Sequence, residues 1–385
     1  MTWLLVAVAA CLMFVTGAAF AAQNPPKPDA NTALVAEAVT GDLLWTLKPR
    51  RKVPIASITK IMTALVVLDR TKLKDKVVVS ERAAQVGEAT ANLRAGEELT
   101  VEQLLAAMLV ESANDAANAL ADHVGARGGV KRFVRLMNRK AEEIGLTDTT
   151  FVRPDGLDVD GHVSSARDVM LLARRAMQNE DFRELVQLEQ VTLPGNRRLD
   201  TTNDLLRSYA GLTGVKTGHT SAAGWSQVGS ARRDGVQLYG VVLGGTSREQ
   251  RNSDLAALLD WGFEQFGRVE VISAGTVYAR SRIPFQDDRR LELVADRSVS
   301  RIVQWNEPLE ERVRAPAMIS LPVIAGQPLG SVEIIDANGE VIAERPLIAT
   351  ESIAVTSIPD RTSWYLRRAF DNAGDAFSSV FGLLR

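Results

Sequence analysis

Ser57 and Lys60 are the pair of residues whose types and spacing best suit chemistry in this 385-residue sequence. They open the apolar run 61–68, which predicts a helix buried on most of its faces. Three positions apart, the two side chains are expected on one face in the first turn of that helix. A hydroxyl beside a lysine can serve as a nucleophile if the surroundings keep the amine neutral. Alone, such a pair more often marks an ordinary helix start with a surface lysine.

Two further motifs help to decide between a catalytic pair and an ordinary helix start. Ser112-Ala113-Asn114 falls at a break between predicted helices, where a chain can present side chains to a cleft. Lys216-Thr217-Gly218 lies at the start of a predicted strand. Separately, the first motif is typical of a helix N-cap and the second of an edge lysine near a turn. Together with Ser57 and Lys60 they fit one chemical task.

In that task Ser57 attacks a carbonyl carbon and forms an ester. Lys60 takes the hydroxyl proton, and the second cation, Lys216, disfavours protonation of both amines. Ser112 relays a proton to the departing amine, and Asn114 holds the backbone of the substrate. The sequence therefore predicts acyl transfer through a serine ester.

The strand motif would bind the substrate. Lys216 and Thr217 offer charge and hydrogen bonds to a substrate carboxylate. Gly218 has no side chain, so the substrate can lie against this strand edge as an added strand. The backbone N–H groups of Ser57 and His219 are the candidates for an oxyanion hole, with His219 acting through its backbone.

The composition excludes several other classes of protein. The formal charge of −2 and the lack of a Lys/Arg block argue against nucleic acid as a partner. The three histidines do not form a zinc-type pair, which argues against a metal site. No other cofactor is expected. Cys11 is the only cysteine, so an exported mature chain would have neither disulfides nor a thiol nucleophile.

The N-terminus predicts export. Residues 3–15 are apolar and are followed by small residues at 17–22, which indicates a secretory signal peptide over 1–21. An uncleaved anchor helix is one alternative, although the apolar run is short for a span. A lipoprotein-type cleavage before Cys11 is the other. We expect the mature protein in the periplasm or on the extracytoplasmic face of the cytoplasmic membrane.

The elements that must position these motifs predict a first domain over 30–267. Two β-hairpins are predicted, with turns at 40–42 and 233–235. The spacing of apolar residues predicts helices over 101–111, 115–123, 130–144, 165–177 and 251–266. Helices at both ends with hairpins between them favour an α+β fold, an antiparallel sheet covered by helices.

Two further segments follow. Short Val/Ile runs over 270–352 predict a small all-β domain, with a two-residue hairpin turn at Asn338-Gly339. The tail, 360–385, has apolar residues mostly three or four positions apart and predicts an amphipathic helix that lies on a membrane surface. A helix docked on its own domain is the alternative.

The order and spacing of Ser-x-x-Lys, Ser-x-Asn and Lys-Thr-Gly resemble those of the penicillin-recognising serine enzymes. Within that group the chain is similar to the low-molecular-mass penicillin-binding proteins that are D-alanyl-D-alanine carboxypeptidases. The segments that carry the likeness are 56–63 (ASITKIMT), 154–157 (PDGL) and 216–224 (KTGHTSAAG). The likeness is close over 31–266 and looser over the β domain, and the tail is similar to that family's membrane-anchoring helix.

The resemblance implies a β-lactamase/transpeptidase-like fold with a five-stranded antiparallel sheet between helices. It implies removal of the terminal D-alanine from peptidoglycan stem peptides through an acyl-enzyme on Ser57, which β-lactams would trap. Relatives often carry an arginine just ahead of the segment 203–206, where this chain has Thr202. No arginine is therefore assigned to the substrate carboxylate.

Three alternatives remain open at this stage. A β-lactamase on the same fold usually needs a glutamate in the loop 153–162, which offers only aspartates. A D-Ala endopeptidase differs only in its substrate. A non-catalytic wall-binding or penicillin-sensing protein would not need all of these nucleophilic residues.

Overall fold

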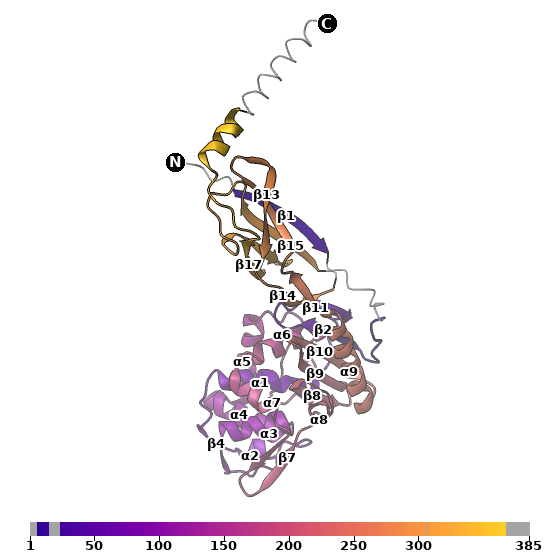
Figure 1. The fold of residues 1–385 in the computed structure, drawn as a ribbon. Coiled ribbons are helices and arrows are strands. Elements are labelled where there is room, and N and C mark those ends of the chain that lie inside the picture. The colour runs from indigo at the N-terminus through magenta and orange to yellow at the C-terminus, as the bar shows by residue number, and fades with distance from the viewer. Residues whose placement is uncertain (1–5, 15–23, 306, 367–385) are drawn as a thin grey trace. The chain divides into compact units, whose positions relative to one another are not determined.

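A computed structural model describes residues 6–14, 24–305 and 307–366 of the chain (Figure 1). Two compact units can be distinguished, one over residues 21–265 and one over 266–385 together with the N-terminal segment 1–20. Each unit is described by itself. The boundaries expected from the sequence, 30–267 and 270–352, stay predictions.

The first unit is built on a five-stranded antiparallel sheet with the strand order β3-β2-β10-β9-β8. Its strands are β2 (Thr32–Glu37), β3 (Leu43–Leu47), β8 (Leu212–Thr220), β9 (Gly224–Arg233) and β10 (Val236–Gly245). The hairpin predicted at 233–235 is present: Arg233 pairs with Val236 across Asp234 and Gly235, which have φ of 47° and 91°. Two positive φ values in succession match the right-handed twist of the strands. The predicted fold class is confirmed.

Helices cover both faces of this sheet. On one face lies α9 (Arg248–Glu264), and a Cβ added to Gly240 of β10 would stand 2.5 Å from Leu255 of this helix. The neighbours of Gly240 in the strand, Tyr239 and Val241, point to the opposite face because successive side chains alternate. There they join the same buried cluster as α1 (Lys60–Leu68) and α6 (Ala166–Ala176).

The other elements of this unit form its helical part. Their bounds are η1 (Ala56–Thr59), β4 (Lys76–Val78), α2 (Glu81–Ala84), β5 (Glu98–Thr100), α3 (Val101–Val110), α4 (Asn114–Gly125), η2 (Ala126–Gly128), α5 (Gly129–Glu143), α7 (Glu180–Val186), β6 (Gln190–Leu193), β7 (Arg197–Asp200) and α8 (Leu205–Ser208). The predicted helices are found within a few residues of their expected ends. The short helix α7 was not predicted, and α9 begins three residues earlier than expected, since Ser247 caps it by accepting a hydrogen bond from Gln250 N.

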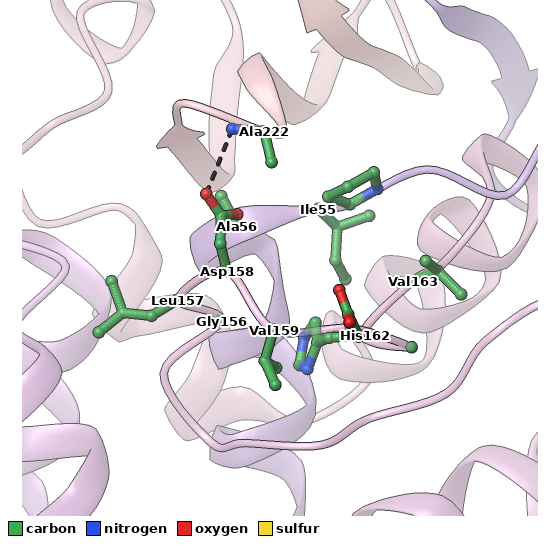
Figure 2. A pocket seen from close by; sticks show the side chains of 12 residues that line it. Ile55, Ala56, Gly156, Leu157, Asp158, Val159, His162, Val163 and Ala222 are labelled. Carbon is green, nitrogen blue, oxygen red and sulfur yellow. Dashed lines mark hydrogen bonds between the residues drawn. The ribbon is translucent and has the colours of Figure 1, made fainter.

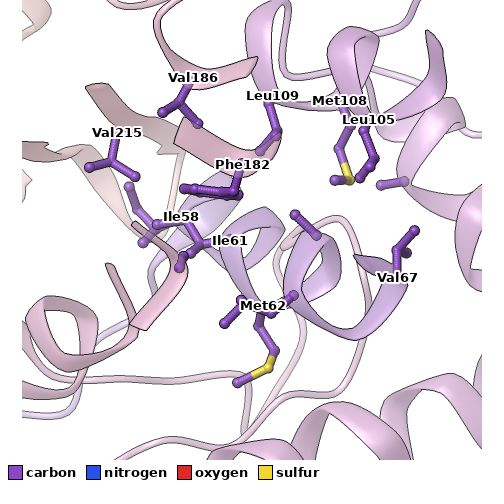
Figure 3. Close-up of a cluster of buried hydrophobic side chains, with 14 of the residues drawn as sticks. Ile58, Ile61, Met62, Val67, Leu105, Met108, Leu109, Phe182, Val186 and Val215 are labelled. Atoms are coloured by element: carbon purple, nitrogen blue, oxygen red, sulfur yellow. The ribbon is translucent and has the colours of Figure 1, made fainter. Parts of the chain in front are cut away.

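The core of the helical part surrounds the segment that carries Ser57 and Lys60. Figure 3 shows Ile58, Ile61 and Met62 among side chains of α3 and α7, and all three are fully buried. Phe182 and Val186 of α7 lie in the same cluster. Close packing on this scale fixes side-chain positions, so the start of α1 is held rigidly.

The second unit is an all-β domain with a core of its own. Its main sheet has the order β1-β15-β16-β17-β13-β12, and β11 pairs with β14. The bounds are β11 (Phe266–Ile272), β12 (Val277–Ile283), β13 (Gln286–Ala295), β14 (Val299–Gln304), β15 (Pro308–Pro316), β16 (Pro328–Ile335) and β17 (Val341–Ala349).

The hairpin between β16 and β17 has a longer turn than predicted. Ile335 pairs with Val341, so five residues rather than two connect the strands. The carboxylate of Asp336 accepts the backbone N–H groups of Asn338 and Glu340, at 2.9 and 2.8 Å. These side-chain hydrogen bonds stabilise the longer turn, and they favour it over the two-residue turn predicted at Asn338-Gly339.

Within the segment assigned above to a signal peptide, residues 6–14 form β1 (Val6–Phe14), which pairs antiparallel with β15. Removal of a signal peptide would therefore expose this edge of the sheet. The signal peptide stays a prediction.

The predicted C-terminal helix is seen in part. Residues 358–366 are helical, whereas 367–385 lie outside the described residues. Trp364 packs edge-on against Phe285 of the turn between β12 and β13, and its indole N–H donates to Asp287 at 2.8 Å. Within the described ranges, no helix has the length and apolar character needed to cross a membrane.

Candidate active site

Ser57 lies in the short 3₁₀ turn η1, immediately before α1, rather than in the first turn of α1 as predicted. Ala56 has a φ of 47°, which bends the chain sharply into this turn. A 3₁₀ turn keeps residues three apart in line, so Ser57 and Lys60 still face each other. Their Oγ and Nζ atoms are 2.6 Å apart.

The amine of Lys60 has three oxygen neighbours. Besides Ser57 Oγ, these are Asn114 Oδ1 at 2.7 Å and the backbone carbonyl of Asp155 at 2.8 Å. The last two oxygens can only accept hydrogen bonds, and a neutral amine has two N–H bonds to give them. Its lone pair is then left facing Ser57, in the direction that a proton acceptor requires.

Burial favours the neutral form of Lys60. Its side chain is fully buried, and desolvation lowers its pKa to about 7. The negative charge of Asp155 opposes this shift, and the positive charge of Arg153 adds to it. A pKa near neutrality is what a general base needs at physiological pH.

The junction between α3 and α4 supplies Asn114 and Ser112. Asn114 begins α4, and its Nδ2 donates to the carbonyl of Gly87 at 3.1 Å, which orients Oδ1 toward Lys60. Ser112 has a φ of 69° and a side chain that is nearly buried. The predicted break between the two helices is therefore a sharp backbone bend that sends the chain toward Lys60.

The loop 153–157, which contains the Pro154-Asp155-Gly156-Leu157 segment, closes the site from behind Lys60. The Asp155 carboxylate accepts from Asn118 at 2.7 Å and from Arg153 at 2.6 and 3.0 Å. It also accepts the backbone N–H of Leu157 at 3.0 Å. These contacts fix the carbonyl of Asp155 on Lys60.

His162 and Thr63 tie the same loop to the serine segment. The His162 ring lies 2.7 Å from the hydroxyl of Thr59, and its Nδ1 accepts the N–H of Val152 at 3.0 Å. Burial lowers the pKa of His162 to about 4, so Nε2 carries the proton and donates to Thr59. Thr63 donates to the carbonyl of Pro154 at 2.6 Å.

Strand β8 brings the third motif to the same place. An added Cβ on Gly218 would stand 3.1 Å from the backbone nitrogen of Ser57 and 2.9 Å from the carbonyl of Ile55. Lys216 is fully buried and donates to the carbonyl of Thr217 at 3.1 Å. Its pKa is lowered, first by burial and then by the positive charges of Lys60 and Arg251.

The remaining predicted site residues on β8 are Thr217, which is buried, and His219. The hydroxyl of Thr217 is 2.7 Å from that of Thr202, the residue that stands in place of an arginine. His219 is exposed, and its ring stacks on Trp225 with the ring centres 3.9 Å apart. Hydrogen bonds thus join Ser57, Lys60 and Asn114 directly, whereas β8 approaches them through Gly218 and through charge.

Comparison with known proteins adds an independent observation. A family model for D-alanyl-D-alanine carboxypeptidase (peptidase S11) matches residues 18–247, and a model for the C-terminal domain of penicillin-binding protein 5 matches 266–355. The chain belongs to the D-alanyl-D-alanine carboxypeptidase family. Its activity is that of a serine-type carboxypeptidase, a hydrolase.

Individual relatives match along most of their length. D-alanyl-D-alanine carboxypeptidase DacF of Bacillus subtilis is 31% identical over 359 residues, 89% of this chain and 92% of the relative. DacC of Escherichia coli is 32% identical over 367 residues, 91% of each chain. The structure of penicillin-binding protein 5 from Haemophilus influenzae superimposes with a TM-score of 0.62 at 27% identity, covering 86% of this chain and 99% of the other.

The carboxypeptidase also has a cavity of about 190 Å³ beside the serine turn, lined by Ala56 and by the loop 156–163 (Figure 2). Asp158 is one of the residues that line this cavity. As Figure 2 shows, its carboxylate accepts the N–H of Ala222, at 3.2 Å, and it also accepts the hydroxyl of Thr220 at 2.6 Å. These bonds link the loop to the end of β8.

Sequence reasoning missed the residues that support the carboxypeptidase site. No motif or spacing in the sequence predicts a contact of Asp155, Gly156 or His162 with the serine segment. The one signal for them was Pro154-Asp155-Gly156-Leu157, quoted for its likeness to the family and not for any contact with Lys60. The residues that bury and charge the surroundings of Lys60 lie about 55 and 95 positions away in the sequence. The spacing of residues within one motif cannot reveal contacts over such separations.

Proposed function

We propose that Ser57 is the nucleophile of this carboxypeptidase and that neutral Lys60 is its general base. The observation that carries the proposal is the set of three oxygens around Lys60, two of which can only accept hydrogen bonds. As Ser57 attacks the carbonyl carbon between the two terminal D-alanines, its proton passes to Lys60. The N–H groups of Ser57 and His219 stabilise the negative charge that develops on the carbonyl oxygen.

Collapse of this intermediate breaks the peptide bond. Ser112 relays a proton to the departing amine of D-alanine, and the remaining peptide stays on Ser57 as an ester. Asn114 holds the backbone of that peptide. Water then attacks the ester, with Lys60 accepting the proton of the water, and free Ser57 returns. A β-lactam follows the same first step, but its opened ring stays attached through the carbon framework.

Lys216 and Thr217 are proposed to bind the free carboxylate of the substrate, with Gly218 leaving room for its backbone. Because Gly218 has no side chain, β8 can lie directly against the serine turn: an added Cβ would stand 3.1 Å from Ser57 N. Within the described part of the chain the amine of Lys216 has one hydrogen-bond acceptor, the carbonyl of Thr217 at 3.1 Å, so an incoming carboxylate can supply a further one.

Release of D-alanine tests these assignments. Purified protein should liberate D-alanine from a diacetyl-L-Lys-D-Ala-D-Ala peptide, and Ser57→Ala should liberate none. D-alanine release by Ser57→Ala would exclude Ser57 as the nucleophile. A D-Ala endopeptidase would be favoured instead if cross-linked peptides were cleaved and this peptide were not.

We further propose that the enzyme is exported and works at the extracytoplasmic face of the membrane. The signal peptide over 1–21 and the amphipathic segment 360–385 support this placement, with domains over 30–267 and 270–352 between them. In the described part of the tail region, Ile358, Tyr365 and Leu366 are 79%, 60% and 56% exposed. Apolar and aromatic side chains exposed together at a helix suit the interfacial layer of a membrane.

A further inference from the structure

Arg251 of α9 is a buried cation for which the proposed mechanism gives no role. The residue is 2% exposed, and its Nε and Nη2 donate to Asn252 Oδ1 at 3.1 and 2.6 Å. Its nearest carboxylate, on Asp204, is 3.6 Å from Nη2. That carboxylate already accepts two hydrogen bonds from Arg248, at 2.8 and 2.5 Å. The charge of Arg251 is thus only partly neutralised.

A stack of side chains leads from Arg251 to the rim of the active site. The guanidinium carbon lies 5.7 Å from the ring centre of Trp225, and Trp225 stacks on His219. A cation near an aromatic ring is held by the charge distribution of the ring. Trp225 therefore lies between Arg251 and His219, the residue whose backbone N–H is proposed for the oxyanion hole.

Strand register places Arg251 on the same face as Thr217. In the antiparallel pair β8–β9, Thr217 lies opposite Gln227 and His219 lies opposite Trp225. Residues opposite each other, and those two apart along a strand, share one face of a sheet. Arg251 packs on Trp225 and so lies on the face that carries the hydroxyl of Thr217.

The surroundings of Thr217 are polar and incompletely satisfied. Gln227 donates to Asn203 Oδ1 at 2.7 Å, but Gln227 Oε1 and Asn203 Nδ2 are buried without a hydrogen-bond partner among the described residues. The charge of Arg251 also reaches Lys216, since it contributes to the lowered pKa of that amine. This is the region where Thr202 replaces the arginine that relatives often carry.

We propose that Arg251 is a specificity-determining residue of the carboxypeptidase: its buried charge, held against Trp225 on the sheet face that carries Thr217, makes the site selective for substrates that end in a free carboxylate. Arg251 is a positioning residue, because it acts through the electrostatic potential at Lys216 and Thr217 and not by touching the substrate. The inference rests on the proposed binding of the carboxylate by those two residues.

The test compares two peptides that differ only at the C-terminus, diacetyl-L-Lys-D-Ala-D-Ala and its C-terminal amide. Arg251→Met should lower kcat/KM for the acid roughly tenfold, mainly through KM, the order expected for one partly screened charge near the ligand. The amide should change less than about twofold. Arg251→Lys keeps the charge and should restore most of the loss.

Arg233→Met is the control, since it removes an arginine that pairs with Asp260 and not with Asp204. It should leave the ratio of the two peptides unchanged. Should Arg251→Met fail to fold, Asp204→Asn gives a test of opposite sign. Loss of this carboxylate leaves Arg251 less neutralised, so kcat/KM for the acid should rise a few-fold relative to the amide.

Equal losses for both peptides in Arg251→Met would show a purely structural role and overturn the inference, as would an unchanged ratio in Asp204→Asn. Lys216→Ala separates this failure from that of the carboxylate assignment. If Lys216→Ala loses the preference for the acid and Arg251→Met keeps it, only the role of Arg251 is wrong. If Lys216→Ala also keeps the preference for the acid, the carboxylate binds elsewhere, and the roles given to Lys216 and to Arg251 are both wrong.

Discussion

Gly156 lies directly against the carbonyl of Ala56, the residue before Ser57. A Cβ added to Gly156 would stand 2.0 Å from Ala56 O and 2.8 Å from the hydroxyl of Thr59, and its φ is +86°. A side chain is excluded both by contact and by backbone conformation. The loop that holds Lys60 from behind thus also sets the position of the serine turn.

This contact predicts a local effect of Gly156→Ala on acylation. The methyl group must push the loop from Ala56, which displaces the Asp155 carbonyl from Lys60. We expect acylation by benzylpenicillin to slow at least a hundredfold and the free energy of unfolding to fall by roughly 1–3 kcal/mol. Gly161→Ala is the control in the same loop, with a φ of +79° and open space at its Cβ. Equal acylation rates in the two variants would refute the role given to Gly156.

The pH dependence of acylation should follow the protonation of Lys60. Because desolvation lowers its pKa to about 7, the amine is mostly charged below pH 7 and cannot accept the proton of Ser57. The acylation rate should therefore fall about tenfold per pH unit below pH 6 and level off above pH 8. Stopped-flow mixing with a chromogenic β-lactam between pH 5 and 9 measures this. A flat profile would exclude a lysine base of this kind.

Asp155→Asn should move that profile in a defined direction. The negative charge of Asp155 raises the pKa of Lys60 and Arg153 lowers it. The substitution removes the effect of Asp155 and keeps that of Arg153, so the pKa of Lys60 should fall. The acylation rate should therefore begin to decrease at a lower pH than in the unsubstituted protein. Unfolding should require roughly 1–3 kcal/mol less, because Arg153 loses its partner. A shift toward higher pH would contradict the charge balance described for Lys60.

Deletion of the tail tests the proposed membrane contact. A chain that ends at Arg361 should keep D-alanine release, because all the proposed site residues lie within the unit 21–265, and it should leave the membrane fraction. Co-sedimentation with vesicles containing anionic lipid measures binding, with the full chain as control. Continued sedimentation of the shortened chain would place the membrane contact elsewhere.

Much of the fold could be predicted because its elements are locally encoded. The repeating apolar positions of α3, α5 and α6, and the turn at Asp234-Gly235, follow from sequence patterns over a few residues. The short helix α7 could not, since seven residues offer too little periodicity. The turn between β16 and β17 was misjudged because Asp336 competes with Asn338-Gly339 for the backbone.

Three motifs indicated the candidate site residues, and the structure brings Ser57, Lys60 and Asn114 together. What the motifs do not specify is the environment that sets proton positions. Asp155, Arg153 and Arg251 act on the two lysines by charge across long sequence separations, and His162 acts through one hydrogen bond to Thr59. These effects depend on burial, which the pattern of residue types does not report.

The identity of the labelled residue tests the central claim most directly. After brief exposure to benzylpenicillin, mass spectrometry should find one opened penicillin per chain, on the peptide that contains Ser57. Lys60→Met, which should fill the same buried space without an amine, should carry no label on that time scale. Label on another residue, or equally fast labelling of the Lys60 variant, would contradict a serine activated by the neighbouring amine.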